Sequence, residues 1–139
     1  MRVEYWENSF KAGWINLDNR GRIGRNAEIV FTQGHCHSFA AALHTLTGWP
    51  IVGFVCHSID NRKDSPGHVA CKISKREYCD ILGPGALVRQ KEKYPDTRVY
   101  KLGYSDISSG LDCYLPLAVE KAIPFAKTML QKYFGDTHV

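Results

Sequence analysis

The clearest pattern of apolar positions along the chain lies between residues 36 and 47. Small and apolar side chains recur there at the spacing of one helix face, at Phe39, Ala40, Leu43, Leu46 and Thr47. This spacing predicts an amphipathic helix that begins at His35 or Cys36. Gly48 follows as a stop and Pro50 stands two residues beyond it, which is typical of a helix C-terminus.

Strand patterns follow this helix. The apolar, β-rich run at residues 51–56 predicts a buried strand. Residues 68–82 alternate around a turn at 74–77, which predicts a hairpin closed by the Gly83-Pro84-Gly85 turn. Residues 98–102 predict one more short strand.

The two ends of the chain give weaker patterns. Residues 1–28 combine scattered aromatics with a polar, Gly- and Arg-rich stretch, so we expect an irregular lead-in. An apolar stripe predicts a C-terminal helix over residues 115–134, with a kink or a break at Pro124. The order helix, strand, hairpin, strand, helix predicts an α+β fold in which an antiparallel sheet packs against helices.

The length and amino-acid composition limit the classes of protein to which the chain can belong. The chain has 139 residues, of which 44% are hydrophobic and 23% charged, and this favours one globular domain over residues 1–139. No apolar run approaches the ~18 residues of a membrane helix. The first residues lack the apolar core and cleavage site of a signal peptide. We therefore expect a cytoplasmic protein; export by a signal-independent secretion system is the alternative.

The net charge of +4 changes this picture little. The densest basic runs, at residues 72–76 and 89–93, are short and are followed by or interleaved with acidic residues, so the sequence carries no strong nucleic-acid signal. It indicates no membrane partner and leaves the oligomeric state open.

The chain contains five cysteines and no C-x-x-C pair. Their odd number and the length of the chain favour reduced thiols. We expect four of them to be buried and inert, namely Cys56, Cys71, Cys79 and Cys113. A cross-strand disulfide between Cys71 and Cys79 is the alternative. Cys36 differs from these four because it opens the predicted helix.

Cys36, His68 and Asp80 together suggest nucleophilic chemistry. A helix N-terminus favours a thiolate, and its backbone N–H groups can hold an oxyanion. An imidazole beside the thiol would complete the activation, and a carboxylate would orient that imidazole. His68 and Asp80 share a face of the hairpin if its turn has a three-residue loop or a bulge; with an even loop, they need a bulge.

Each of the three residues also has a simpler interpretation. A lone cysteine at a helix start is commonly a packed small residue, and a histidine at a strand edge is commonly a surface or capping residue. An aspartate before Ile-Leu-Gly is commonly a turn residue. The placement of all three in this order favours chemistry over these separate interpretations.

Three motifs surround these residues: Thr32-Gln33-Gly34-His35-Cys36-His37 at a helix start, Gly67-His68-Val69-Ala70-Cys71, and Tyr78-Cys79-Asp80-Ile81-Leu82-Gly83. Together they resemble motifs of the papain-like cysteine hydrolase superfamily, with its NlpC-type and transglutaminase-like members, and most closely those of small bacterial and phage-borne proteins. The resemblance covers residues 30–83. It implies a papain-like fold whose N-terminal catalytic helix packs on the antiparallel sheet, followed by a C-terminal helix.

The resemblance also implies residue roles. Cys36 matches the nucleophile, His68 the general base and acid, and Asp80 the residue that orients the histidine. Gln33 is the candidate oxyanion donor, although it lies nearer to the cysteine than in papain. His35 and His37 are candidates for the wall of the cleft.

The implied activity is that of a thiol-dependent hydrolase or acyl transferase acting on an amide or isopeptide bond. Such an enzyme forms an acyl-thioenzyme, needs no cofactor and acts on a protein, peptide or peptidoglycan-like amide. It would be a cysteine peptidase, amidase, deamidase or transglutaminase-like enzyme. The alternative is a catalytically inactive papain-like protein of a phage or mobile element that acts as a binding protein or inhibitor.

A metal site at His35, Cys36, His37 and His44 is a further alternative. Neighbouring residues of a helix point to different sides, and no second ligand pair has a zinc-like spacing, so we expect no metal.

Overall fold

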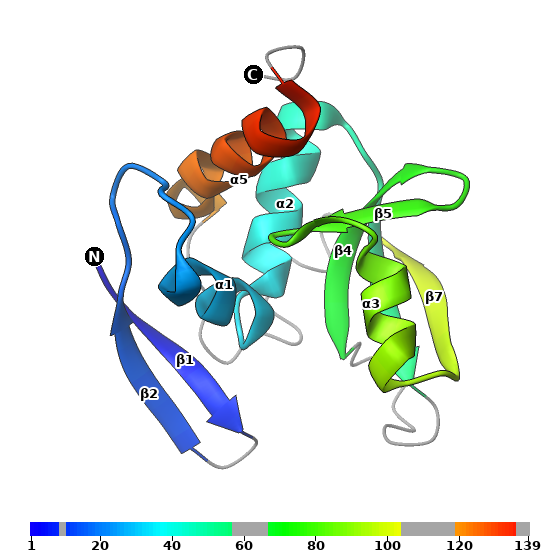
Figure 1. The fold of residues 1–139 in the computed structure, drawn as a ribbon, viewed down its shortest axis with the longest axis horizontal. Coiled ribbons are helices and arrows are strands. Elements are labelled where there is room, and N and C mark those ends of the chain that lie inside the picture. The colour runs from blue at the N-terminus through cyan, green and yellow to red at the C-terminus, as the bar shows by residue number, and fades with distance from the viewer. Residues whose placement is uncertain (9–10, 57–66, 104–118, 136–139) are drawn as a thin grey trace.

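The computed structural model describes residues 1–8, 11–56, 67–103 and 119–135. Its elements are β1 (Arg2–Asn8), β2 (Lys11–Asn16), α1 (Arg25–Thr32), α2 (Cys36–Thr47), β3 (Ile51–Cys56), β4 (His68–Ser74), β5 (Glu77–Asp80), β6 (Gly83–Pro84), α3 (Ala86–Lys93), β7 (Thr97–Leu102) and α5 (Val119–Phe134). Within this part of the chain the fold is α+β, as predicted, with four helices, a five-stranded sheet and a separate two-stranded hairpin (Figure 1).

The five-stranded sheet has the order β6-β5-β4-β3-β7, and every neighbouring pair is antiparallel. The strand predicted at residues 51–56, the hairpin at 68–82 and the strand at 98–102 are confirmed as β3, β4–β5 and β7. All six residues of β3 are buried, in agreement with its unbroken apolar run. Two of the strands, β4 and β5, carry candidate site residues.

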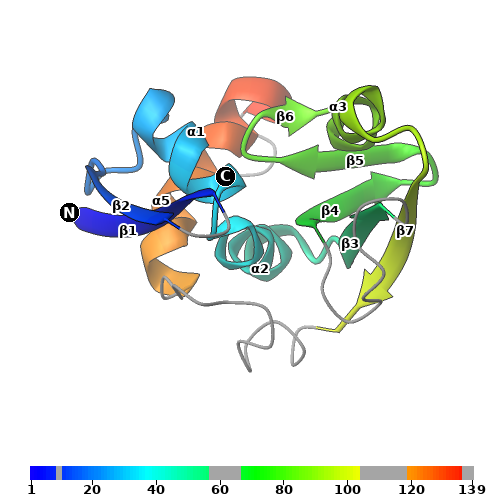
Figure 2. The ribbon, with the colours of Figure 1, turned by 90° about the horizontal axis from the view of Figure 1, so that it is seen from below.

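The sheet separates two apolar clusters, because successive side chains of a strand point to opposite faces. One face contributes Ile51, Val69, Cys71, Cys79 and Ile81 to the main core, which it shares with α1, α2 and α5. The other face contributes Val52, Phe54, Ala70 and Tyr78 to a smaller cluster with Ala86 of α3. Figure 2 shows α2 alongside β4 and α3 alongside β5.

The helix predicted over residues 36–47 is confirmed as α2. It ends at Gly48, which has a φ of 76° and donates its N–H to the His44 carbonyl at 2.8 Å. The helices α1, α2 and α5 lie between the β1–β2 hairpin and the five-stranded sheet (Figures 1 and 2). The α2 N-terminus is thereby held from both sides.

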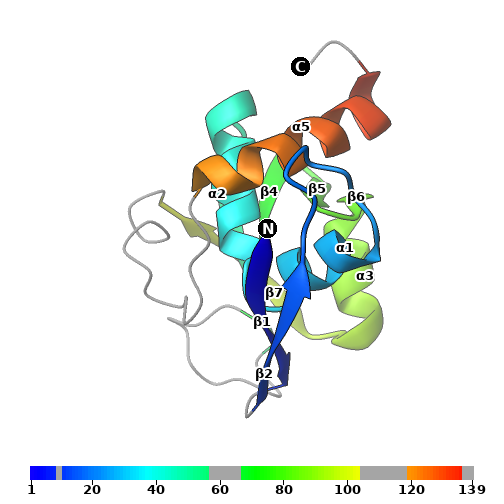
Figure 3. The same cartoon turned by 90° about the vertical axis from the view of Figure 1, so that its left-hand side faces the viewer.

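The prediction of an irregular lead-in over residues 1–28 is wrong. This segment forms the antiparallel β1–β2 hairpin and the first turn of α1, and Figure 3 shows the hairpin from its outer side. Paired backbone groups of Met1 and Leu17 close its open end, at 2.9 and 2.6 Å. Val3 and Leu17 join the main core, so tertiary packing orders a stretch whose composition favours loops. The eight-residue helix α3 was also not predicted.

The C-terminal helix is confirmed in part, since residues 115–118 lie outside the described residues. α5 runs from Val119 to Phe134 as one helix that includes Pro124, so the predicted break into two pieces does not occur. A proline costs the hydrogen bond to the carbonyl four residues earlier. Here that residue is Glu120, which is exposed in the first turn. None of the helices that the structure describes is long and apolar enough to cross a membrane.

Two glycines with positive φ give a test of this packing. A Cβ on Gly48 (φ 76°) would meet nothing within 4 Å, so Gly48→Ala carries only the backbone cost of about 1–2 kcal/mol. A Cβ on Gly83 (φ 94°) would lie 2.6 Å from the Tyr133 ring of α5. We expect Gly83→Ala to lower the free energy of unfolding more than Gly48→Ala in urea titrations. Equal losses would contradict the close contact between β6 and α5.

Candidate active site

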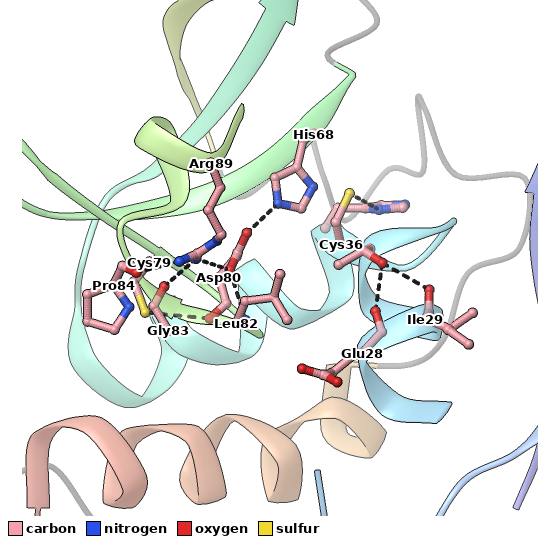
Figure 4. Close-up of polar contacts among 12 residues, drawn as sticks. Glu28, Ile29, Cys36, His68, Cys79, Asp80, Leu82, Gly83, Pro84 and Arg89 are labelled. Carbon is pink, nitrogen blue, oxygen red and sulfur yellow. Dashed lines mark hydrogen bonds and ion pairs between the residues drawn. The ribbon is translucent and has the colours of Figure 1, made fainter. Parts of the chain in front are cut away.

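Cys36, His68 and Asp80 meet at one place, although each comes from a different element. Cys36 is the first residue of α2, His68 the first of β4 and Asp80 the last of β5. The His68 Nε2–H donates to the Asp80 Oδ2 at 2.8 Å. Figure 4 shows the other side of the His68 ring facing the Cys36 sulfur. The imidazole therefore lies between a thiol and a carboxylate.

The register of the β4–β5 hairpin brings the histidine and the aspartate onto one face. The turn holds two residues, an even number that by itself would place His68 and Asp80 on opposite faces. A bulge at Ile73 shifts the pairing by one residue, so that Cys71 lies opposite Cys79. Asp80 follows directly and becomes a diagonal neighbour of His68 on the same face. The condition stated from the sequence, an even loop with a bulge, is the one that occurs.

The Cys36 thiol is half-buried at a helix start that no side chain caps. Burial alone raises the pKa of the thiol. Hydrogen bonding to His37 and to His68, with the positive charge of both rings, outweighs burial and lowers the pKa to about 5. At neutral pH this thiol is therefore a thiolate, which is the nucleophilic form.

His68 and Asp80 are both buried and stabilise each other's charged forms. Burial lowers the pKa of His68, but hydrogen bonds to Asp80 and Cys36 and their negative charges raise it to about 10. Burial raises the pKa of Asp80, but His68, Arg89 and the Leu82 N–H together hold it below its usual value. The thiolate–imidazolium pair is thus the stable form between about pH 5 and pH 10.

His37 and His35 lie on either side of Cys36 and have different surroundings. His37 is buried, and its Nδ1 lies 4.0 Å from the Cys36 sulfur, so this ring does reach the candidate site. His35 is buried as the N-cap residue of α2, and its Nε2–H donates to the Glu4 carbonyl at 2.7 Å. Burial lowers the pKa of His35, which favours its neutral form. His35 thereby joins β1 to the start of α2.

Two other residues named from the sequence, Gln33 and His44, have different surroundings. Gln33, the candidate oxyanion donor, is exposed as the C-cap residue of α1. His44 is partly buried and donates from Nδ1 to the Trp49 carbonyl at 2.9 Å, which fixes the chain after α2.

Among the described residues, the other three cysteines are buried and not bridged. Cys71 and Cys79 are paired across β4 and β5, yet both are free thiols, so the alternative of a cross-strand disulfide is wrong. Burial raises the pKa of Cys71 to about 12 and raises that of Cys79 as well. Cys56 donates to the Asp96 carboxylate at 2.8 Å. Cys113 lies outside the described residues.

A cavity of about 450 Å³ borders two members of the candidate triad, His68 and Asp80. His68 and Asp80 form part of its wall, Thr32 of α1 stands at another side, and Arg89, Gln90 and Lys93 line it from α3. This volume falls within the range of small-ligand sites. The cavity can therefore hold a group that contacts the histidine and the aspartate.

Sequence reasoning missed Arg89, which contacts Asp80 from α3. Its Nη2 donates to the Asp80 Oδ1 at 2.8 Å and to the Gly83 carbonyl at 2.8 Å, and its Nη1 donates to the Pro84 carbonyl at 2.6 Å (Figure 4). The only signal for it was the pattern of a short helix after Gly85. That pattern does not reveal which residue the long side chain reaches.

A comparison of the chain with known proteins found no relative: no family model, curated protein or solved structure matches it. The described residues contain no cluster of three or more His, Cys, Asp or Glu side chains that could hold a metal ion.

The lowered pKa of Cys36 gives a direct test. We expect iodoacetamide to label Cys36 about tenfold or more faster than Cys56 at pH 6, because Cys36 is a thiolate there, whereas the buried Cys56 thiol donates its proton to the Asp96 carboxylate. The rate constant for Cys36 should reach half its plateau near pH 5. Peptide mass spectrometry after timed labelling would measure both. A midpoint near pH 8.5, or labelling no faster than at Cys56, would contradict the assignment.

The contact between His37 and the thiol gives a second test. His37→Ala removes one of the two rings that stabilise the thiolate, so the midpoint of the Cys36 alkylation profile should rise by about one pH unit. His44→Ala is the matched control, because His44 lies on the same helix and bonds to Trp49. An unchanged midpoint in His37→Ala would show that His68 alone activates the thiol.

Proposed function

We propose that the protein is a thiol-dependent hydrolase or acyl transferase of papain-like type that acts on an amide or isopeptide bond. The observation that carries this proposal is the His68 ring, which bonds to Asp80 on one side and interacts with the Cys36 thiolate on the other. A nucleophile at a helix start, facing a histidine and an aspartate on the sheet, supports the papain-like assignment.

In the acylation step, the Cys36 sulfur attacks the carbonyl carbon of the substrate. A C–S bond forms, and the carbonyl electron pair moves to oxygen, next to the backbone N–H groups of the first turn of α2. The oxyanion then collapses and the C–N bond breaks. His68, protonated until then, gives its proton to the departing nitrogen, so the amine leaves neutral and an acyl-thioenzyme remains.

In the second step, His68 is neutral and removes a proton from the incoming nucleophile, which attacks the thioester carbon. The C–S bond breaks, the sulfur leaves as thiolate, and the imidazolium is regenerated. Water gives a carboxylic acid, whereas an amine gives a new amide. Asp80 holds the ring in one orientation through both steps, because its Oδ2 accepts the Nε2–H.

The cavity beside His68 and Asp80 supports a place for a polar part of the substrate. Its α3 wall offers Gln90 and Lys93, and its α1 wall offers Thr32. Such a lining suits a protein, peptide or peptidoglycan-like amide better than an apolar acyl chain. Segments outside residues 30–83 thus contribute to the proposed substrate site.

An activated ester tests the proposal without knowledge of the natural substrate. We expect p-nitrophenyl acetate to acetylate Cys36 and to turn over, with p-nitrophenol release lost in Cys36→Ala and retained in Cys56→Ala. Intact-protein and peptide mass spectrometry would locate the acetyl group. Added glycine methyl ester would divert the acyl group into an amide if the enzyme is a transferase.

Circular dichroism would check that both alanine variants remain folded. Ester turnover in Cys36→Ala equal to that of the wild type would contradict the proposal. It would leave the alternative of a papain-like protein that acts by binding.

A further inference from the structure

The Asp80 carboxylate is held at both of its oxygens. Its Oδ2 accepts from His68 at 2.8 Å. Its Oδ1 accepts from Arg89 Nη2 at 2.8 Å and from the Leu82 N–H at 2.9 Å. The three donors come from β4, from α3 and from the chain just after β5.

The contacts to Oδ1 matter because the carboxylate of an aspartate rotates easily about its last torsion angle. A carboxylate bonded to the imidazole alone could rotate and lose the alignment of the ring. Donors on Oδ1 remove this freedom, and the planar guanidinium of arginine suits the task because it can donate to several acceptors in fixed directions.

The backbone fixes the guanidinium independently of the aspartate. Arg89 donates to the carbonyls of Gly83 and Pro84, at 2.8 and 2.6 Å, so β6 holds it in place. The Gly85 N–H in turn donates to the Glu77 carboxylate at 2.8 Å, which ties the start of α3 to β5. The backbone before α3 thus holds the Arg89 guanidinium in a fixed position beside Asp80.

We propose that Arg89 is a positioning residue of the site, which holds Asp80 and through it keeps His68 aligned with the Cys36 thiolate. This inference rests on the proposed function. It adds a fourth side chain, so that thiolate, imidazolium, carboxylate and guanidinium alternate in charge along one row. Alternation keeps the row close to neutral, which reduces the cost of burying its two inner charges, those of His68 and Asp80.

Few other charged groups face this row in the described residues. His37 contacts the thiol from α2, and Glu77 of β5 bonds to the Gly85 N–H. Glu92 and Lys93 line the neighbouring cavity from α3. Of these side chains, none bonds to the Asp80 carboxylate, which therefore depends on Arg89 for its countercharge away from His68.

A double-mutant cycle between Arg89 and Asp80 tests the inference. The measurement is the pH profile of Cys36 alkylation by iodoacetamide in the full chain, for the wild type, Arg89→Met, Asp80→Asn and the double variant. We expect Arg89→Met to raise the midpoint by about one pH unit, which slows labelling at pH 5.5 about threefold. In the Asp80→Asn background, the same change should move the midpoint no further.

Two further variants separate positioning from a structural role. Arg89→Lys keeps the charge but not the fork of donors, so its midpoint should lie between those of the wild type and Arg89→Met. Lys91→Met removes the same charge from an exposed position of α3 and should leave the profile unchanged. If Arg89→Met does not fold, as judged by circular dichroism, the cycle is measured with Arg89→Lys.

The outcomes distinguish this inference from the proposed function. A wild-type midpoint near pH 8.5 would contradict the proposed function itself. A low wild-type midpoint that Asp80→Asn raises but Arg89→Met does not would overturn only the role of Arg89. A shift that is additive in the double variant would also overturn it, because Arg89 would then act without Asp80.

Discussion

The hydrogen bond between His68 and Asp80 is the interaction on which the candidate site depends. Both side chains are buried, and a buried charge is costly unless a partner of opposite sign lies beside it. The aspartate makes the imidazolium stable, and the imidazolium in turn makes the Cys36 thiolate stable. Each ionised group therefore exists because of its neighbour.

Three parts of the fold position the residues that form this hydrogen bond and the residues that contact them. The β4–β5 hairpin supplies the histidine and the aspartate at one end of the sheet. The packing of α2 on β4 brings the thiol to the same end. On the opposite face, α3 packs on β5 and supplies Arg89. The candidate site lies where the two faces of the sheet meet at its end, which explains how side chains from both layers contact one imidazole.

Much of this could be predicted from local patterns. The bounds of α2 and β3 follow from apolar spacing and a glycine stop, which depend only on neighbouring residues. The β1–β2 hairpin and α1 were missed because their composition is polar, and contacts such as those of Val3 and Leu17 with the main core order them. The helix through Pro124 likewise depends on packing that a propensity rule does not include.

The sequence by itself determined which residues could do chemistry, because a thiol at a helix start, a strand histidine and a hairpin aspartate are local features. Only the tertiary structure decided whether they meet. The bulge at Ile73 sets the register that puts His68 and Asp80 on one face, and a one-residue slip would reverse it. The same holds for Arg89, since the reach of a long side chain depends on where α3 docks, and docking is a property of the whole core.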